Sequence, residues 1–159
     1  MHARDIRNGI QNIAMVHWER RLFDSLIPLP DGTSYNAYIV KGRDATALID
    51  SADPALQDEL MQELQGVERI DYIVSQHSEQ DHSGAIPLVL ARFPNAKLIC
   101  SGKAKDLLTS HLNVPEDRLV TVEDGQAISL GDRTLQFVHT PWVHWPETMC
   151  TYIPEDKSL

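Results

Sequence analysis

The sequence predicts an α+β fold in which helices and strands are stacked as a layered sandwich. Between residues 34 and 112, a predicted hairpin is followed by segments that alternate between helical and extended patterns. After residue 118, short apolar runs are instead separated by close-set turns, which is typical of an antiparallel meander. This order of elements favours a layered α/β or α+β sandwich over an open parallel sheet.

The composition indicates an ordinary globular domain. The chain has 159 residues, of which 42% are hydrophobic and 23% charged, enough for one domain with a core. A net charge of -9 argues against nucleic acid or an anionic membrane as a partner. There is no apolar run of about 20 residues and no apolar signal-peptide core at the N-terminus. Cys100 and Cys150 are predicted to be small hydrophobic side chains in a reduced, cytoplasmic protein.

Each predicted element follows from a local pattern. Alternating β-branched and aromatic residues indicate strands, which we expect at residues 9–18, 34–41, 45–50, 68–75, 97–101, 118–122, 126–130, 134–139 and 149–153. Helical spacing of leucines and other apolar residues indicates helices at residues 53–66, 85–93 and 103–112. Asp53 can cap the first helix, Pro54 fits its first turn, and Gly66 ends it.

Four residues with metal-binding side chains follow one of these strands within a span of six residues. They are His77, Glu79, Asp81 and His82. In an extended segment, residues two apart point the same way, so His77 and Glu79 can aim at one point. Asp81 joins them if the loop stays extended, whereas His82 needs a turn, which Gly84 permits. The carboxyl end of a buried strand is a common place for a functional site in α/β proteins.

This spacing suits two neighbouring metal positions. His77 and Glu79 would serve one position, and Asp81 and His82 the other, with the metals about 3.5–4 Å apart. Imidazoles mixed with carboxylates suit iron, manganese or zinc, and anionic oxygen favours a ferric state. His144, in a proline-bounded loop between two tryptophans, is the natural fifth ligand. The alternative, a polar surface loop without metal, is disfavoured by the coincidence of the four side chains with a strand end and a helix start.

The remaining candidates have structural alternatives. His111 lies in a polar helix and is predicted to be solvated, and His17 is predicted to be structural. His139 ends a strand and could orient the loop that carries His144. Asp50 also ends a strand, where it either hydrogen-bonds a metal ligand or is an ordinary strand-end carboxylate.

The first ligand loop resembles a known signature. His77-x-Glu79-x-Asp81-His82 is similar to the motif of the metallo-β-lactamase superfamily, in which the second position is usually His. Glutamate there resembles the flavodiiron proteins, the A-type flavoproteins that include rubredoxin:oxygen oxidoreductase and flavorubredoxin. Further segments that resemble this family are residues 33–38, 47–50, 71–74 and 140–152, the last being its second ligand loop.

The resemblance implies an αββα sandwich with a non-haem diiron site that reduces O2 to water or nitric oxide to nitrous oxide. It implies that His77, Glu79 and His144 bind one iron, and Asp81 and His82 the other. Members of the family carry a flavodoxin-like domain after the metal domain. Its FMN, reduced by rubredoxin or a similar carrier, passes electrons to the diiron site of the partner subunit in a head-to-tail homodimer.

The chain also departs from the family pattern. The family's bridging Asp, a further His ligand and the flavodoxin-like domain have no counterpart within residues 1–159. The chain is therefore expected to be the N-terminal portion of the metal domain, with one apolar sheet face left uncovered. A truncated product and half of a split protein both fit this expectation. A zinc hydrolase of the same superfamily, or an inactive remnant that serves as an interaction module, is the alternative.

Overall fold

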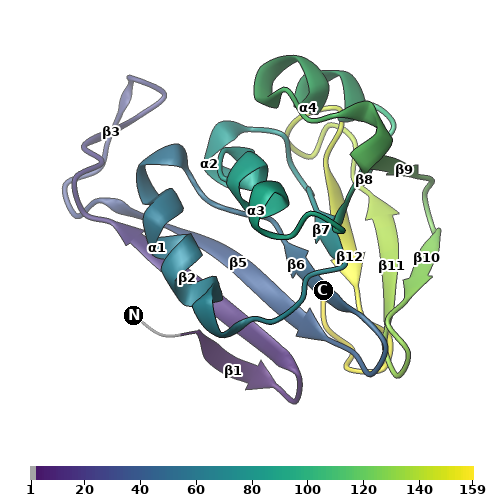
Figure 1. Cartoon of the computed structure of the whole chain (residues 1–159). Coiled ribbons are helices and arrows are strands. Elements are labelled where there is room, and N and C mark those ends of the chain that lie inside the picture. The colour runs from purple at the N-terminus through teal and green to yellow at the C-terminus, as the bar shows by residue number, and fades with distance from the viewer. Residues whose placement is uncertain (1–2) are drawn as a thin grey trace.

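The chain forms three layers: helices, a seven-stranded mixed sheet and a three-stranded sheet. A computed structural model describes residues 3–159 (Figure 1). The large sheet has the strand order β1-β2-β5-β6-β7-β8-β9, and the small sheet has the order β10-β11-β12. The strands of the large sheet are β1 (Arg4–Arg7), β2 (Ile10–His17), β5 (Thr33–Lys41), β6 (Thr46–Ile49), β7 (Tyr72–Val74), β8 (Lys97–Ser101) and β9 (Leu119–Val122). The strands of the small sheet are β10 (Ala127–Ser129), β11 (Thr134–His139) and β12 (Met149–Tyr152).

The helices cover one face of the large sheet. They are η1 (Pro54–Leu56), α1 (Gln57–Glu63), η2 (Leu64–Gly66), α2 (Gln80–Ser83), α3 (Ile86–Arg92), α4 (Lys105–Leu112) and η3 (Glu116–Arg118). Leu60, Ile86 and Leu108 from three of these helices pack against Ile13 and Ile73 of the sheet in one buried cluster. Burying such side chains stabilises the fold by about 1.5–3 kcal/mol each. The predicted helix at residues 53–66 is one continuous helical region, but only its middle is α-helical.

The small sheet covers part of the other face of the large sheet. Phe137 and Met149 of the small sheet share a second buried cluster with Val40, Val74 and Ile99 of the large one. The antiparallel pairing of β10 with β11 and of β11 with β12 confirms that part of the predicted meander. The layered sandwich predicted from the sequence is therefore present.

Strand β9 corrects the prediction for residues 118–122. We expected this strand to begin the meander, but β9 pairs in parallel with β8 in the large sheet. The reason is the intervening helix α4, which provides the crossover that a parallel connection needs. Strands β6, β7, β8 and β9 are thus all parallel, and their carboxyl ends meet at one edge of the sheet.

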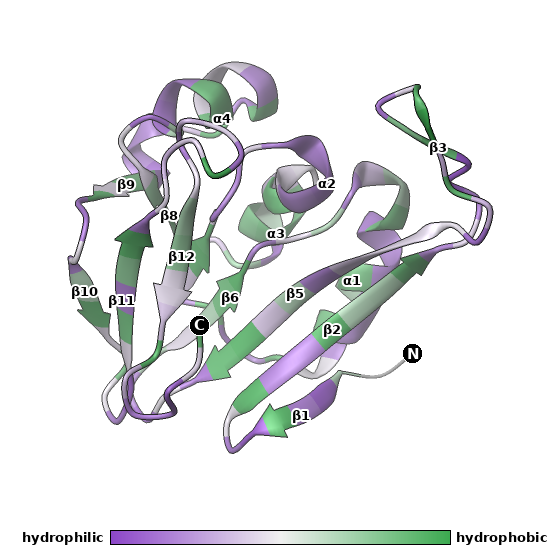
Figure 2. Cartoon of the chain, turned by 180° about the vertical axis from the view of Figure 1, so that it is seen from behind, coloured by the Kyte–Doolittle hydropathy of each residue, from purple (hydrophilic) through white to green (hydrophobic). Residues whose placement is uncertain are grey.

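The sheet face that β2 and β5 present beyond the small sheet carries polar as well as apolar side chains. Where β2 and β5 extend beyond the small sheet, Asn36 and Ala14 are directly paired, and the Asn12 side-chain amide donates to Asn36. Seen from behind, these two strands carry mixed colours rather than a continuous apolar stripe (Figure 2). Polar side chains on this face reduce its tendency to aggregate.

Three short strands had no signal in the sequence pattern. Strand β1 lies at the edge of the large sheet, and β3 (Leu22–Phe23) pairs with β4 (Ile27–Pro28) in a small projecting hairpin.

Cys100 is buried, as predicted, and burial raises the pKa of its thiol to about 12; Cys150 is half-buried. Within residues 3–159, no helix is both long and apolar enough to cross a bilayer.

Candidate metal centre

The first ligand loop begins where β7 ends, at the shared carboxyl edge of the parallel strands. The Ser75 hydroxyl donates to the main-chain carbonyl of His77 over 3.0 Å. The main-chain N–H of Gln76 donates to Asp50 Oδ1 over 2.8 Å. These bonds hold the start of the loop against the neighbouring β6 strand end. Asp50 therefore acts on the residue before His77 rather than on a metal-binding side chain itself.

The loop then turns earlier than the sequence suggested. Glu79 is still extended, with φ -65° and ψ 145°, but the short helix α2 starts at the next residue. The Ser83 hydroxyl bonds to the carbonyls of Ser78 and Glu79, each over 2.9 Å, and so closes this turn. The loop does not stay extended as far as Asp81, so the condition for Asp81 to point with His77 and Glu79 is not met. The chain turns at α2, which lies before Gly84, so the turn does not depend on the glycine.

The second ligand loop joins β11 to β12. Its two ends are tied together, because the Thr140 N–H donates to the carbonyl of Thr148 over 2.9 Å and the Thr148 hydroxyl donates back over 2.6 Å. Trp142 adopts the left-handed conformation with φ 64°, which is uncommon for a bulky residue. This closed loop carries His144 towards the first loop.

Three of the five predicted ligands meet at one point. Glu79 Oε2 lies 3.0 Å from His77 Nε2 and 3.3 Å from His144 Nε2. One ligand atom from each of the three residues lies within 4.8 Å of the others. Metal–ligand bonds of about 2.1 Å allow two ligand atoms of one ion to be about 4.2 Å apart. A shift of a few tenths of an ångström in each side chain would place all three on one ion, so these residues fit a metal.

Asp81 and His82 form a separate pair beside this group. His82 Nε2 lies 3.5 Å from Asp81 Oδ2, and the His82 ring centroid is 5.5 Å from that of His77. Asp81 Oδ1 is buried and has no hydrogen-bond partner within residues 3–159. A buried carboxylate oxygen without a donor is costly unless it binds a cation. This pair therefore offers the beginning of a second metal position, with fewer ligands than the first.

The surroundings shift the pKa values of Glu79 and Asp81 in opposite directions. Burial alone would raise the pKa of Glu79, but the hydrogen bonds from His77 and His144 outweigh it and lower that pKa. Burial raises the pKa of Asp81, with opposition from nearby His82 and reinforcement from the Glu79 charge. Glu79 is thus held as an anion by the two imidazoles, whereas Asp81 lacks comparable support from the residues around it.

The sequence did not reveal one residue that contacts the first group. Glu147 Oε1 lies 2.8 Å from His77 Nδ1, and this side chain is fully buried. Its partner is 70 residues away along the chain, so no local spacing could indicate the contact. The only signal was a carboxylate directly after Pro146, three residues beyond His144.

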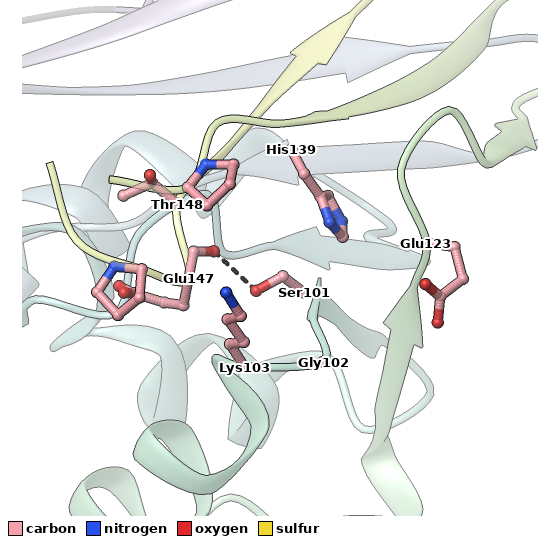
Figure 3. A pocket seen from close by; sticks show the side chains of 9 residues that line it. Ser101, Gly102, Lys103, Glu123, His139, Glu147 and Thr148 are labelled. Carbon is pink, nitrogen blue, oxygen red and sulfur yellow. Dashed lines mark hydrogen bonds between the residues drawn. The ribbon is translucent and has the colours of Figure 1, made fainter. Parts of the chain in front are cut away.

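The two tryptophans of the second loop behave differently. The Trp145 ring meets the His77 ring edge-on, with centroids 5.0 Å apart. Trp142 is 75% exposed, against 37% for Trp145. Among the other histidines, His111 is exposed as predicted. His139 lines a pocket of about 250 Å³ next to the site (Figure 3).

Comparison with known proteins identifies the family. A family model described as ODP family beta lactamase matches residues 33–159. The chain belongs to this family. A coenzyme F420H2 oxidase of Methanothermobacter marburgensis is 38% identical over 99% of the chain and 40% of its own length. A nitric oxide reductase of Moorella thermoacetica is 35% identical over 97% of the chain and 39% of its own length.

Solved structures of the ODP family relatives agree with this assignment. Rubredoxin oxygen:oxidoreductase from Desulfovibrio gigas superposes with a TM-score of 0.89, at 31% identity over 96% of this chain and 39% of its own. A flavoprotein from Thermotoga maritima gives the same TM-score at 32% identity over 96% of this chain and 39% of its own. The predicted resemblance to flavodiiron proteins and the metallo-β-lactamase-like fold are confirmed. The chain spans about two fifths of the length of these relatives.

Proposed function

We propose that residues 1–159 are the N-terminal, metal-ligating part of a flavodiiron-type oxidoreductase that reduces O2 to water, nitric oxide to nitrous oxide, or both. The observation that carries this proposal is the position of Glu79 between the imidazoles of His77 and His144. The superfamily motif usually has His at that position, and the glutamate supplies a hard anionic oxygen that suits iron. The names of the relatives, an F420H2 oxidase and a nitric oxide reductase, support the same activity.

In this proposal the two groups of side chains divide the metal binding. His77, Glu79 and His144 hold one iron, while Asp81 and His82 contribute to the second. Iron held by these residues would supply the redox chemistry needed to reduce a diatomic substrate, with electrons from an external donor. The negative charge of Glu79 stabilises the more oxidised metal, and the unpartnered Oδ1 of Asp81 is available as a ligand.

The surroundings of the site suit a small apolar substrate and a large partner. Trp145 packs against the His77 ring and keeps water from that side of the site. Trp142 and Val143 are 75% and 81% exposed on the same loop. Exposed apolar side chains beside a redox site suit the docking of a flavin-bearing partner. We therefore assign FMN as the electron source, reduced by rubredoxin or a similar carrier in the cytoplasm and delivered across a head-to-tail homodimer of the complete protein.

Metal selectivity tests the proposal. The chain is purified without metal, loaded under anaerobic conditions with Fe(II) or Zn(II), and its bound metal is counted. Mössbauer and EPR spectra then report the iron coordination. We expect Fe(II) bound through nitrogen and oxygen ligands, and loss of that binding in the Glu79→Ala variant. Zinc binding without iron binding, together with hydrolysis of lactams or thioesters, would support the hydrolase alternative instead.

The activity itself requires the complete assembly. The iron-loaded chain is therefore mixed with the part of the Moorella thermoacetica relative that it does not match, and O2 and nitric oxide consumption are measured with reduced rubredoxin. We expect consumption of at least one gas, dependent on Glu79. Iron binding without reduction of either gas in the mixture would support the alternative that the chain is an inactive remnant.

A further inference from the structure

We infer that Glu147 is a positioning residue, which keeps a proton on Nδ1 of His77 and holds the ring in the orientation that aims Nε2 at the metal position. The metal-binding part of this inference rests on the proposed function. Its starting point is the hydrogen bond of 2.8 Å between Glu147 Oε1 and His77 Nδ1.

Glu147 is held through one carboxylate oxygen, Oε1, and through its main chain, while Oε2 is buried without a hydrogen-bond partner among residues 3–159. The same Oε1 accepts the main-chain N–H of Ser78 over 3.2 Å. The main-chain carbonyl of Glu147 accepts a hydrogen bond of 2.7 Å from the Ser101 hydroxyl at the end of β8 (Figure 3). The side chain is 0% exposed. A carboxylate fixed in this way presents one oxygen at a defined point, which is what orienting a ring requires.

The contact determines which His77 nitrogen faces the metal position. A carboxylate can only accept, so Nδ1 must carry the proton that it shares with Oε1. The ring therefore turns its other nitrogen, Nε2, toward Glu79 and the metal position, where a bound metal would replace the proton that Nε2 shares with Glu79 Oε2. Nε2 is the atom that lies beside Glu79. Carboxylate partners of this kind fix ring orientation and increase ligand basicity in metal proteins.

Glu147 also joins the two ligand loops. His77 belongs to the loop after β7, and Glu147 lies three residues beyond His144 on the loop between β11 and β12. Two residues further on, the Met149 N–H donates to the Gln76 carbonyl over 3.0 Å. The carboxylate–imidazole bond and this main-chain bond together set the distance between the loops. A positioning role for Glu147 therefore extends to the spacing of His77 and His144.

Three variants separate this role from general stability. Glu147→Leu removes both the acceptor and the charge, whereas Glu147→Gln keeps an amide oxygen that can still accept from Nδ1. Glu123→Gln is the matched control, because Glu123 lines the same pocket but lies outside the hydrogen bonds of His77 (Figure 3). The protonation of His77 Nδ1 is read from ¹⁵N–¹H correlation spectra of histidine-labelled, metal-free chain in mildly alkaline buffer, and Fe(II) affinity is read from anaerobic titration.

We expect wild type and Glu123→Gln to carry a proton on Nδ1 of His77. Glu147→Gln should keep that Nδ1 proton, and Glu147→Leu should lose it. Fe(II) affinity should fall about 10–100-fold in Glu147→Leu and less in Glu147→Gln. If Glu147→Leu fails to fold, the Nδ1 protonation of wild type and the Fe(II) affinity of Glu147→Gln test the inference instead. An unprotonated Nδ1 of His77 in wild type, or unchanged Nδ1 protonation and Fe(II) affinity in folded Glu147→Leu, overturns the inference. Wild type that carries the Nδ1 proton but binds no Fe(II) contradicts the proposed function and does not contradict the positioning of the ring.

Discussion

The two metal positions of this chain differ in how completely the fold builds them. At the first, His77, Glu79 and His144 converge from two loops, and the Glu79 carboxylate already bonds both imidazoles. At the second, Asp81 and His82 are adjacent in the sequence, lie 3.5 Å apart and leave one buried carboxylate oxygen without a partner. A ligand set drawn from distant segments needs the folded sheet, whereas an adjacent pair needs only a turn. The first position is therefore expected to bind metal more tightly.

Loss of Glu79 should have the largest effect. In Glu79→Ala both imidazoles lose their shared acceptor, and the first position loses its only anionic ligand. We expect Fe(II) affinity, measured by anaerobic titration, to fall by more than about 100-fold, beyond the loss typical of an outer hydrogen-bond partner. Asp81→Asn is the matched carboxylate control and should reduce the affinity of this tight position by less than about 10-fold. Equal losses of Fe(II) affinity in the two variants would contradict the proposed difference between the two metal positions.

Replacing Glu79 with histidine should change which metal is preferred. Glu79→His restores the usual superfamily motif and substitutes a neutral nitrogen for an anionic oxygen. We expect the ratio of Zn(II) to Fe(II) affinity to rise about 10-fold or more, measured by competition between the two metals. The ferric state should also become harder to reach, seen as a higher reduction potential. An unchanged metal preference would show that this residue does not select iron.

Removing His144 should separate metal binding from folding. The His144 side chain is 60% exposed, so His144→Ala should change the free energy of unfolding of the metal-free chain by no more than about 0.5 kcal/mol. Fe(II) affinity should nevertheless fall about 10-fold or more. Chemical denaturation and metal titration of the same preparation measure both quantities. A large loss of stability would instead assign His144 a structural role.

Replacing Asp50 should have an effect on stability that depends on pH. Burial raises its pKa to about 6, so the folded chain holds this proton more tightly than the unfolded chain. Between about pH 4 and 6 its contribution to the free energy of unfolding should therefore fall as pH rises, by on the order of 2 kcal/mol. Asn tolerates the left-handed backbone at this position, where φ is 56°, and can still accept from Gln76. Asp50→Asn should thus flatten this part of the stability profile, and an unchanged slope in the variant would assign the slope to other groups.

Features carried by local spacing could be predicted from the sequence. The ligand cluster was visible because His77, Glu79, Asp81 and His82 follow one buried strand, and strand β8 has the predicted bounds of residues 97–101. The direction of β9 could not be predicted, because a four-residue strand looks the same in parallel and antiparallel pairing. The contact between Glu147 and His77 was also beyond local patterns, since the folded sheets bring these residues together.

The same limit explains the early turn after Glu79. Alternation would let Asp81 point with His77 and Glu79 if the loop stayed extended, but the Ser83 hydroxyl donates to two carbonyls of the loop and stabilises α2. A serine among polar residues carries no clear turn signal of its own. The sequence therefore predicted a three-ligand and a two-ligand position, but not the turn that separates them.

Anaerobic titration of the metal-free chain with Fe(II), followed by Mössbauer spectroscopy, tests the division between the two positions most directly. We predict one tightly bound iron per chain, lost in Glu79→Ala and retained in Asp81→Asn, with a second iron bound only at much higher concentration. Two irons bound with equal affinity, or a single tight iron that depends on Asp81 rather than Glu79, would contradict this account.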